Sequence, residues 1–207
     1  MGAFGLMEMV RSMPGVEAPS TSLGSCTLAA RAALFAGDTE AARGWFAVLR
    51  GAAHVDKDAA AALASLVPLA KLSGSVEGQG FQAADLGKWW ETVKSRENAR
   101  ALAETFFSLY DLMVEPVPAE AWDPLLQAAE RTPVPVAGAA LWARLESAAR
   151  NRRVGETVMF ALLALGEGGP GQADAFTLTR VLKALEAAGF KTEARAIAIE
   201  AAVALGL

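Results

Sequence analysis

The sequence has little of the chemistry on which most enzyme sites depend. It contains one cysteine, Cys26, and one histidine, His54. A single cysteine excludes an intrachain disulfide and a metal site made of several thiolates. A single histidine leaves one possible base for a Ser-His-Asp triad. Cys26 stands among small residues of a predicted helix, and His54 stands near a helix end, so packing and surface roles are favoured. We expect no catalytic residue, no cofactor and no metal.

Charge is also sparse, at 20% of the residues with a net charge of −4, beside 53% hydrophobic residues. Disorder needs low hydrophobicity and high net charge, so a disordered chain is excluded. The net negative charge does not favour the binding of nucleic acid by the surface as a whole. Charges or prolines interrupt every apolar run before the roughly 20 residues of a membrane-spanning helix. We expect no nucleic-acid partner and no membrane span.

The first thirteen residues do not form a signal peptide pattern, because Glu8 interrupts the apolar stretch and Arg11 comes late. A lone cysteine does not identify the redox compartment. The sequence therefore leaves the compartment open. It favours the cytoplasm and keeps the periplasm as the alternative if the chain is a mature or excised form.

Alanine is the dominant residue, with 46 copies among 207 residues. Ala, Leu, Arg and Glu favour helices, and the β-branched and aromatic residues that favour strands are few. We predict an all-α fold of about 9–10 helices with no sheet. An N-terminal segment, residues 1–21, is expected to be partly ordered, and residues 22–207 to form a single helical-repeat domain. Six helices are predicted between the two terminal pairs, over residues 57–72, 81–94, 96–114, 119–131, 136–150 and 154–165.

The first terminal pair is a helical hairpin with a very short turn. Ser22 is placed to cap a helix that ends at Ala36, and Gly37 supplies the left-handed position that commonly follows a helix. Asp38 is then placed to cap the next helix, residues 39–50.

The chain ends with a second hairpin of the same kind. Asp174 opens a helix that ends at Gly189, and Thr192 is placed to cap a last helix that runs to about Leu205. The two turns share Ala, Gly, Ala and Arg at matching places in the segments Ala36–Arg43 and Ala188–Arg195.

Aromatic residues follow helical spacing and form apolar stripes on single helix faces. A helix with one bulky stripe and small alanines elsewhere packs closely on neighbours at both sides. This pattern predicts stacked antiparallel helix pairs, an α-α superhelix. The stripes are Ala42-Trp45-Phe46-Leu49, Leu86-Trp89-Trp90-Val93, Ala103-Phe106-Phe107-Tyr110 and Gly138-Leu141-Trp142-Leu145.

The segments Ala29–Leu49 and Val181–Leu205, with their short Ala-Gly turns and the Ala/Arg start of the second helix, resemble the tetratricopeptide and related helical-repeat families. The resemblance implies a right-handed stack of helix pairs that binds proteins or peptides on a concave face.

Two glycine-containing segments match enzyme motifs formally. Gly166–Gly171 matches G-x-G-x-x-G, but a dinucleotide site needs a β-α-β unit around it, and a helical run follows instead. A flexible loop is therefore favoured. Gly2–Met7 resembles the Gly-Leu-Met segment of lytic transglycosylases, although Glu8 stands where that motif carries Gln and the family's catalytic Glu would have to lie upstream. The alternative for Gly2–Met7 is an amphipathic or disordered segment.

Two regions are candidates for partner binding. The first holds the concentrated positive charge of Arg144, Arg150, Arg152 and Arg153, which would suit phosphate or an acidic partner. The alternative is a solvated helix junction in which Arg150 meets a helix C-terminus favourably.

The second region is the last helix, because Ala196–Leu207 contains a single charge, Glu200. A terminal repeat normally presents a polar outer face. Ile199 and Val203 are expected to point away from the preceding helix and to dock on a second copy of the chain, on the N-terminal segment or on a neighbouring domain.

These patterns favour a non-catalytic scaffold or assembly domain of a bacterial protein, which binds a protein or peptide and forms a homodimer through its C-terminal helix. The alternative from another class is the helical accessory region of a cell-wall-acting, lytic transglycosylase-like enzyme that lacks its catalytic Glu here. Nucleic-acid binding through residues 150–153 is opposed by the net negative charge.

Overall fold

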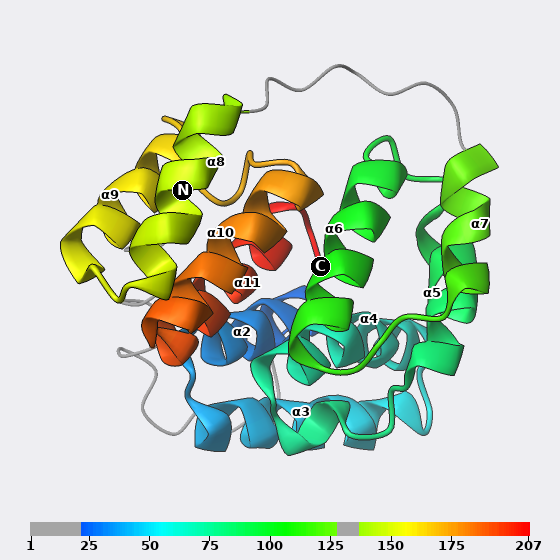
Figure 1. Cartoon of the computed structure of the whole chain (residues 1–207). Helices are drawn as coiled ribbons and strands as arrows, with labels where there is room; N and C mark the ends of the chain where they lie inside the picture. The colour runs from blue at the N-terminus through cyan, green and yellow to red at the C-terminus, as the bar shows by residue number, and fades with distance from the viewer. Residues whose placement is uncertain (1–21, 128–136) are drawn as a thin grey trace. The chain divides into compact units, whose positions relative to one another are not determined.

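Helices make up all the regular structure in the described part of the chain. The computed structural model describes residues 22–127 and 137–207, and no strand occurs within these ranges. The predicted all-α fold is thus confirmed for these residues, which form ten α-helices and two short 3-10 helices (Figure 1). The predicted N-terminal segment, residues 1–21, lies outside them. The elements are α2 (Leu23–Ala36), α3 (Thr39–Ala53), α4 (Lys57–Ser73), η1 (Val76–Gly78), η2 (Ala83–Asp85), α5 (Leu86–Val93), α6 (Ala99–Met113), α7 (Ala119–Gln127), α8 (Ala139–Arg150), α9 (Val154–Leu165), α10 (Ala175–Ala188) and α11 (Lys191–Ala204).

The first hairpin forms as its capping residues predict. Ser22 Oγ accepts the N–H of Ser25 at 3.3 Å, and Asp38 Oδ1 accepts the N–H of Ala41 at 2.9 Å. Gly37 lies between the helices with φ 69°. That left-handed conformation favours glycine, because a Cβ would lie too close to the carbonyl oxygen of its own residue.

The last hairpin differs from the prediction at one residue. Asp174 caps α10 as predicted, because its Oδ1 accepts two backbone N–H groups at 2.9 and 3.0 Å. The prediction that Thr192 caps the last helix is wrong, since the N-cap of α11 is Phe190. Phe190 follows Gly189 directly, and its carbonyl already accepts the N–H of Ala194 at 2.9 Å. The helix therefore begins in the first residues after the turn.

The chain forms two compact units, and the division between them falls in the sequence between Phe81 and Gln82. Unit 1 contains α2, α3, α4 and η1, and unit 2 contains η2 and α5–α11. The sequence had predicted one domain over residues 22–207.

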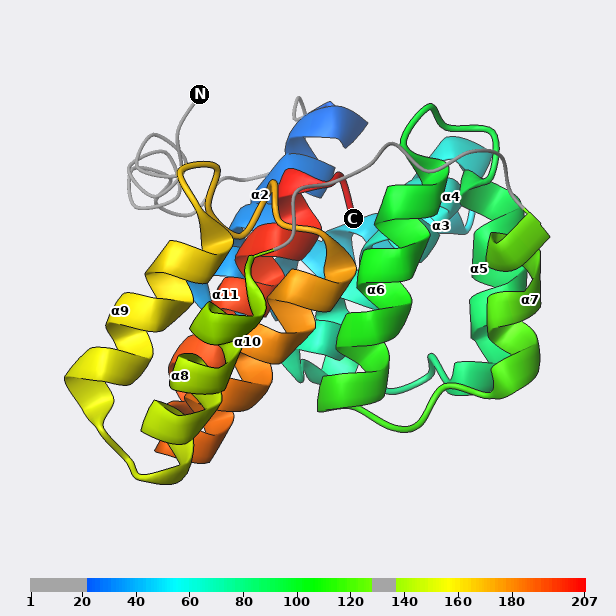
Figure 2. The ribbon, with the colours of Figure 1, turned by 45° about the horizontal axis from the view of Figure 1, so that its top comes forward.

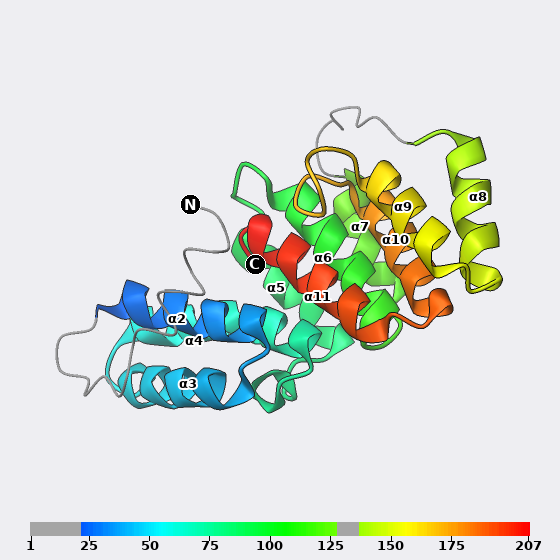
Figure 3. The same cartoon turned by 90° about the vertical axis from the view of Figure 1, so that its left-hand side faces the viewer.

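Unit 1 consists of three helices that each contact the other two, and Figure 3 shows them side by side. Small and large apolar residues alternate in its core, so that alanines of α2 allow the helices to approach closely. The buried side chains include Ala30, Ala33, Leu34, Ala42, Phe46, Leu49, Leu66, Leu69 and Leu72.

The end of α4 is held against η1 by a very close backbone contact. A Cβ added to Gly78 would lie 2.2 Å from the backbone N of Lys71 and 2.4 Å from its Cα. Arg50 also forms an ion pair with Glu77, whose side chain is largely buried. Only glycine permits this approach of η1 to α4.

The core of unit 2 contains the aromatic stripe of α6. Trp89 from α5 packs on Phe106, with ring centroids 4.7 Å apart, and Phe107 meets Trp122 of α7 edge-to-face at 5.5 Å. Among the tryptophans of the aromatic stripes, Trp89, Trp90 and Trp142 are buried, and Trp45 is half-buried.

Tyr110 ties the end of α6 to the following turn. Its hydroxyl donates to Glu115 Oε1 at 2.6 Å, and the same oxygen accepts the N–H of Ala83 at 3.0 Å. Burial and the neighbouring Glu115 carboxylate both raise the pKa of Tyr110 well above its usual value. The phenol therefore stays protonated and remains the donor of the hydrogen bond to Glu115.

Helix α10 lies at the centre of unit 2, in contact with α6, α8, α9 and α11 (Figure 2). In a solenoid each repeat contacts only its neighbours in sequence. The packing of α10 against α6, four helices earlier in the chain, is a different pattern. The predicted solenoid stacking is therefore not confirmed.

Candidate functional site

The last helix does not present the apolar side that its sequence predicted. Ile199 is only 6% exposed, and Val203 is half-buried. The reason is that α11 packs against both α6 and α10, which covers more than one of its sides. Two side-chain donors also fix the chain end: Arg96 donates to the carbonyl of Gly206 and Asn98 to that of Leu205.

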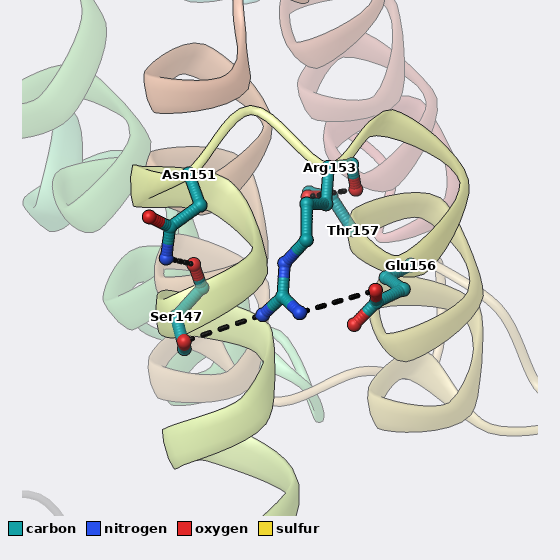
Figure 4. Close-up of polar contacts among 5 residues, drawn as sticks. All are labelled: Ser147, Asn151, Arg153, Glu156 and Thr157. Carbon is teal, nitrogen blue, oxygen red and sulfur yellow. Dashed lines mark hydrogen bonds and ion pairs between the residues drawn. The ribbon is translucent and has the colours of Figure 1, made fainter.

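The predicted arginine group lies around the turn between α8 and α9, and its members behave differently. Arg153 is engaged within the turn: it forms an ion pair with Glu156 at 3.2 Å and donates to Ser147 Oγ at 3.3 Å (Figure 4). Arg144, Arg150 and Arg152 are exposed. The structure brings no carboxylate of the described residues to these three side chains within ion-pair distance.

Arg152 also carries a backbone feature of the turn. It has φ 52° and is the one non-glycine residue with positive φ in the described ranges. Its N–H bonds to the carbonyl of Ala149, and the N–H of Arg153 bonds to that of Ala148, so the pair closes the end of α8 in a Schellman-type turn. Glycine normally occupies the place of Arg152 in this turn.

The feature that sequence patterns missed is the outer face of α9. Five of its large apolar side chains are between 39% and 64% exposed, whereas the residues it buries are the small Thr157 and Ala161. This helix lies at the edge of the group formed by α8, α9 and α10 (Figures 1 and 2). The exposed residues, which we call the α9 face, are Val154, Val158, Met159, Leu162 and Leu163.

The arrangement of residues on α9 is the reverse of that on a usual amphipathic surface helix. A surface helix normally turns its large apolar residues to the core and its polar residues to water. Here no charge occurs between Glu156 and Glu167, and small residues pack against α8 and α10 instead. Five large side chains, about half exposed, leave on the order of 400 Å² of apolar surface on this helix, a size that often marks an interaction site on a monomer.

Aromatic residues lock the helices beside the α9 face. Trp142 of α8 meets Phe176 of α10 edge-to-face at 6.3 Å. The Arg180 guanidinium lies 4.9 Å from the Trp142 ring centroid and pairs with Glu146. These contacts hold α8 on α10 and give α9 a firm support.

The remaining candidates do not assemble into a chemical site. Cys26 is buried, and His54 is exposed at the end of α3. Among the residues that the structure covers, no group of three or more His, Cys, Asp or Glu side chains is placed to hold a metal ion. Residues 157–165 are helical, so the segment Gly166–Gly171 follows a helix rather than a strand. The segment Gly2–Met7 lies outside the described residues.

Comparisons with known proteins give no match, whether with family models, with curated proteins or with solved structures. None of the helices within residues 22–127 and 137–207 has the length and apolar character to cross a membrane.

Proposed function

We propose that this chain is a non-catalytic protein-interaction module and that its docking surface is the α9 face. One observation carries the proposal: α9 exposes five large aliphatic side chains and fully buries only Thr157 and Ala161. Leaving such a surface in water is unfavourable, and a partner that covers it removes that cost.

The support behind α9 favours binding by a preformed surface. Helix α9 packs on α8 and α10, and the α8–α9 turn is closed by the Arg153–Glu156 ion pair and by Thr157, whose hydroxyl donates to the carbonyl of Arg153 at 3.0 Å. A surface that needs no reordering loses less conformational entropy on binding. Recognition then follows the helix-in-groove mode, in which large side chains on one face of a helix serve as anchors.

A photo-crosslinking amino acid in place of Leu162 tests this proposal in the native host. The matched control replaces Leu126 of α7, which is also an exposed helical leucine, at 77% exposure. We expect strong crosslinks to a protein at position 162, to this chain or to another one, and none above background at position 126. Equal yields at the two positions would contradict the proposal, and so would crosslinks at position 162 that form only within a single chain.

A further inference from the structure

We infer that the occupant of the α9 face is the α9 face of a second copy of this chain, packed antiparallel about a two-fold axis. The inference rests on the proposed function, because it names the partner of that same surface.

Four of the five residues of the α9 face lie symmetrically about the point between Phe160 and Ala161. In an antiparallel pair centred between Phe160 and Ala161, Val158 lies level with Leu163 of the other copy, and Met159 lies level with Leu162. A two-fold interface requires such a surface, since each residue pair then occurs twice. Large apolar residues therefore meet large apolar residues at the centre of the contact, and Val154 lies at its edge.

The ends of α9 carry opposite charges that this register brings together. Arg152 and Arg153 precede the helix, and Glu167 follows it. With Val158 level with Leu163, Glu167 of one copy lies level with residue 154 of the other, next to the arginines. The carbonyls at the C-terminus of α9 add negative character beside Glu167.

The charged residues at both ends of α9 are accessible for such an ion pair. Glu167 and Arg152 are exposed, and neither has an ion-pair partner among the described residues. A parallel arrangement would instead place Arg152 beside Arg152 of the second copy and Glu167 beside Glu167 of the second copy. Like charges would then repel each other at both ends of the helix pair. Charge complementarity thus selects the antiparallel pair.

The size of the face sets the expected affinity. Stable interfaces bury about 800 Å² on each partner, whereas the α9 face provides about half of that. We therefore expect a weak dimer with a dissociation constant in the micromolar range, which populates well at about 100 µM protein.

Sedimentation equilibrium of the full chain up to about 100 µM tests the dimer. Leu162→Glu is expected to weaken it by on the order of a hundredfold, because a charge enters the centre of the contact twice. The control Leu126→Glu, on α7, should leave it unchanged. A wild-type chain that stays monomeric overturns the inference, and so does a dimer that survives Leu162→Glu with its circular dichroism spectrum intact.

Charge exchange tests the antiparallel register. Arg152→Glu and Glu167→Arg should each weaken the dimer by about fivefold, since each removes two symmetry-related exposed pairs. The double variant should recover wild-type affinity at low salt, and the recovery should fade at high salt. Single variants without effect, or a double variant that stays weak, overturn the antiparallel arrangement.

The outcomes also separate this inference from the proposed function. If the wild-type chain is monomeric and the residue at position 162 still crosslinks to a different protein, the second copy is excluded and the interaction module stands. If position 162 crosslinks to no separate molecule, both the second-copy inference and the proposed interaction module are refuted.

Discussion

The contact between Gly78 and α4 gives a sharp test of how unit 1 is held together. Gly78→Ala adds one carbon atom, which would lie 2.2 Å from the backbone N of Lys71, 2.4 Å from its Cα and 2.7 Å from the carbonyl carbon of Ala70. All three atoms belong to the backbone of α4, so no side chain can rotate away. The turn must move outward, and the Arg50–Glu77 ion pair moves with it. Overpacking costs about 1–3 kcal/mol, and we expect the upper end here.

The assay is thermal and urea unfolding of the full chain, followed by circular dichroism at 222 nm. In a unit of this size, a loss of about 3 kcal/mol lowers the midpoint of thermal unfolding by roughly 10–20 °C. Gly80→Ala is the matched control, because a Cβ there meets nothing within 4 Å. Fewer unfolded conformations should make that variant neutral or up to about 1 kcal/mol more stable. Equal stability of the two variants would refute the steric argument.

Three further changes test unit 2. Tyr110→Phe should cost about 1.5–3 kcal/mol at neutral pH by removing a hydrogen bond to a carboxylate. Because the folded-state pKa of Tyr110 is raised, wild-type stability should be retained below pH 10 and fall above it, and a variant with the same alkaline fall would contradict this assignment. Asp174→Ala should cost about 1 kcal/mol through the lost cap of α10, whereas Asp174→Asn should be nearly neutral. Arg152→Gly should raise the free energy of unfolding by about 0.5–1 kcal/mol, because glycine removes the strain of the left-handed backbone and this gain exceeds the added entropy of the unfolded chain. An unchanged free energy of unfolding in urea would argue against strain at this residue.

Local signals in the sequence were sufficient to place most helices. Ser22, Asp38 and Asp174 act within three residues of their own position, so their roles as caps do not depend on the rest of the fold. Helix α9 begins and ends as predicted, at Val154 and Leu165. The cap of α11 was placed two residues late, because the turn after Gly189 supplies the first helical carbonyl without a polar side chain.

Tertiary relations were less accessible from the sequence. The division between Phe81 and Gln82 follows from which helices contact one another, and periodicity within a helix carries no information on that. The contact of Gly78 with Lys71 is of the same kind, because a glycine in a turn has many possible reasons. The ion pair between Arg180 and Glu146 also joins helices far apart in the chain.

The candidate site was missed because composition reports how apolar a helix is and not which side is covered. Helix α9 and the segment Ala196–Leu207 each contain a single charge, and the sequence favoured the second as a docking surface, although Ile199 proves buried. Both helices pack on two others, and the difference lies in which residues are covered: α11 buries Ile199 together with alanines, whereas α9 buries only Thr157 and Ala161. A helix that uses its small residues for close packing has its large residues left over for another surface. Leu162 and Leu163 are such residues. A helix that combines small inner residues with large outer ones is therefore a candidate for binding an external partner.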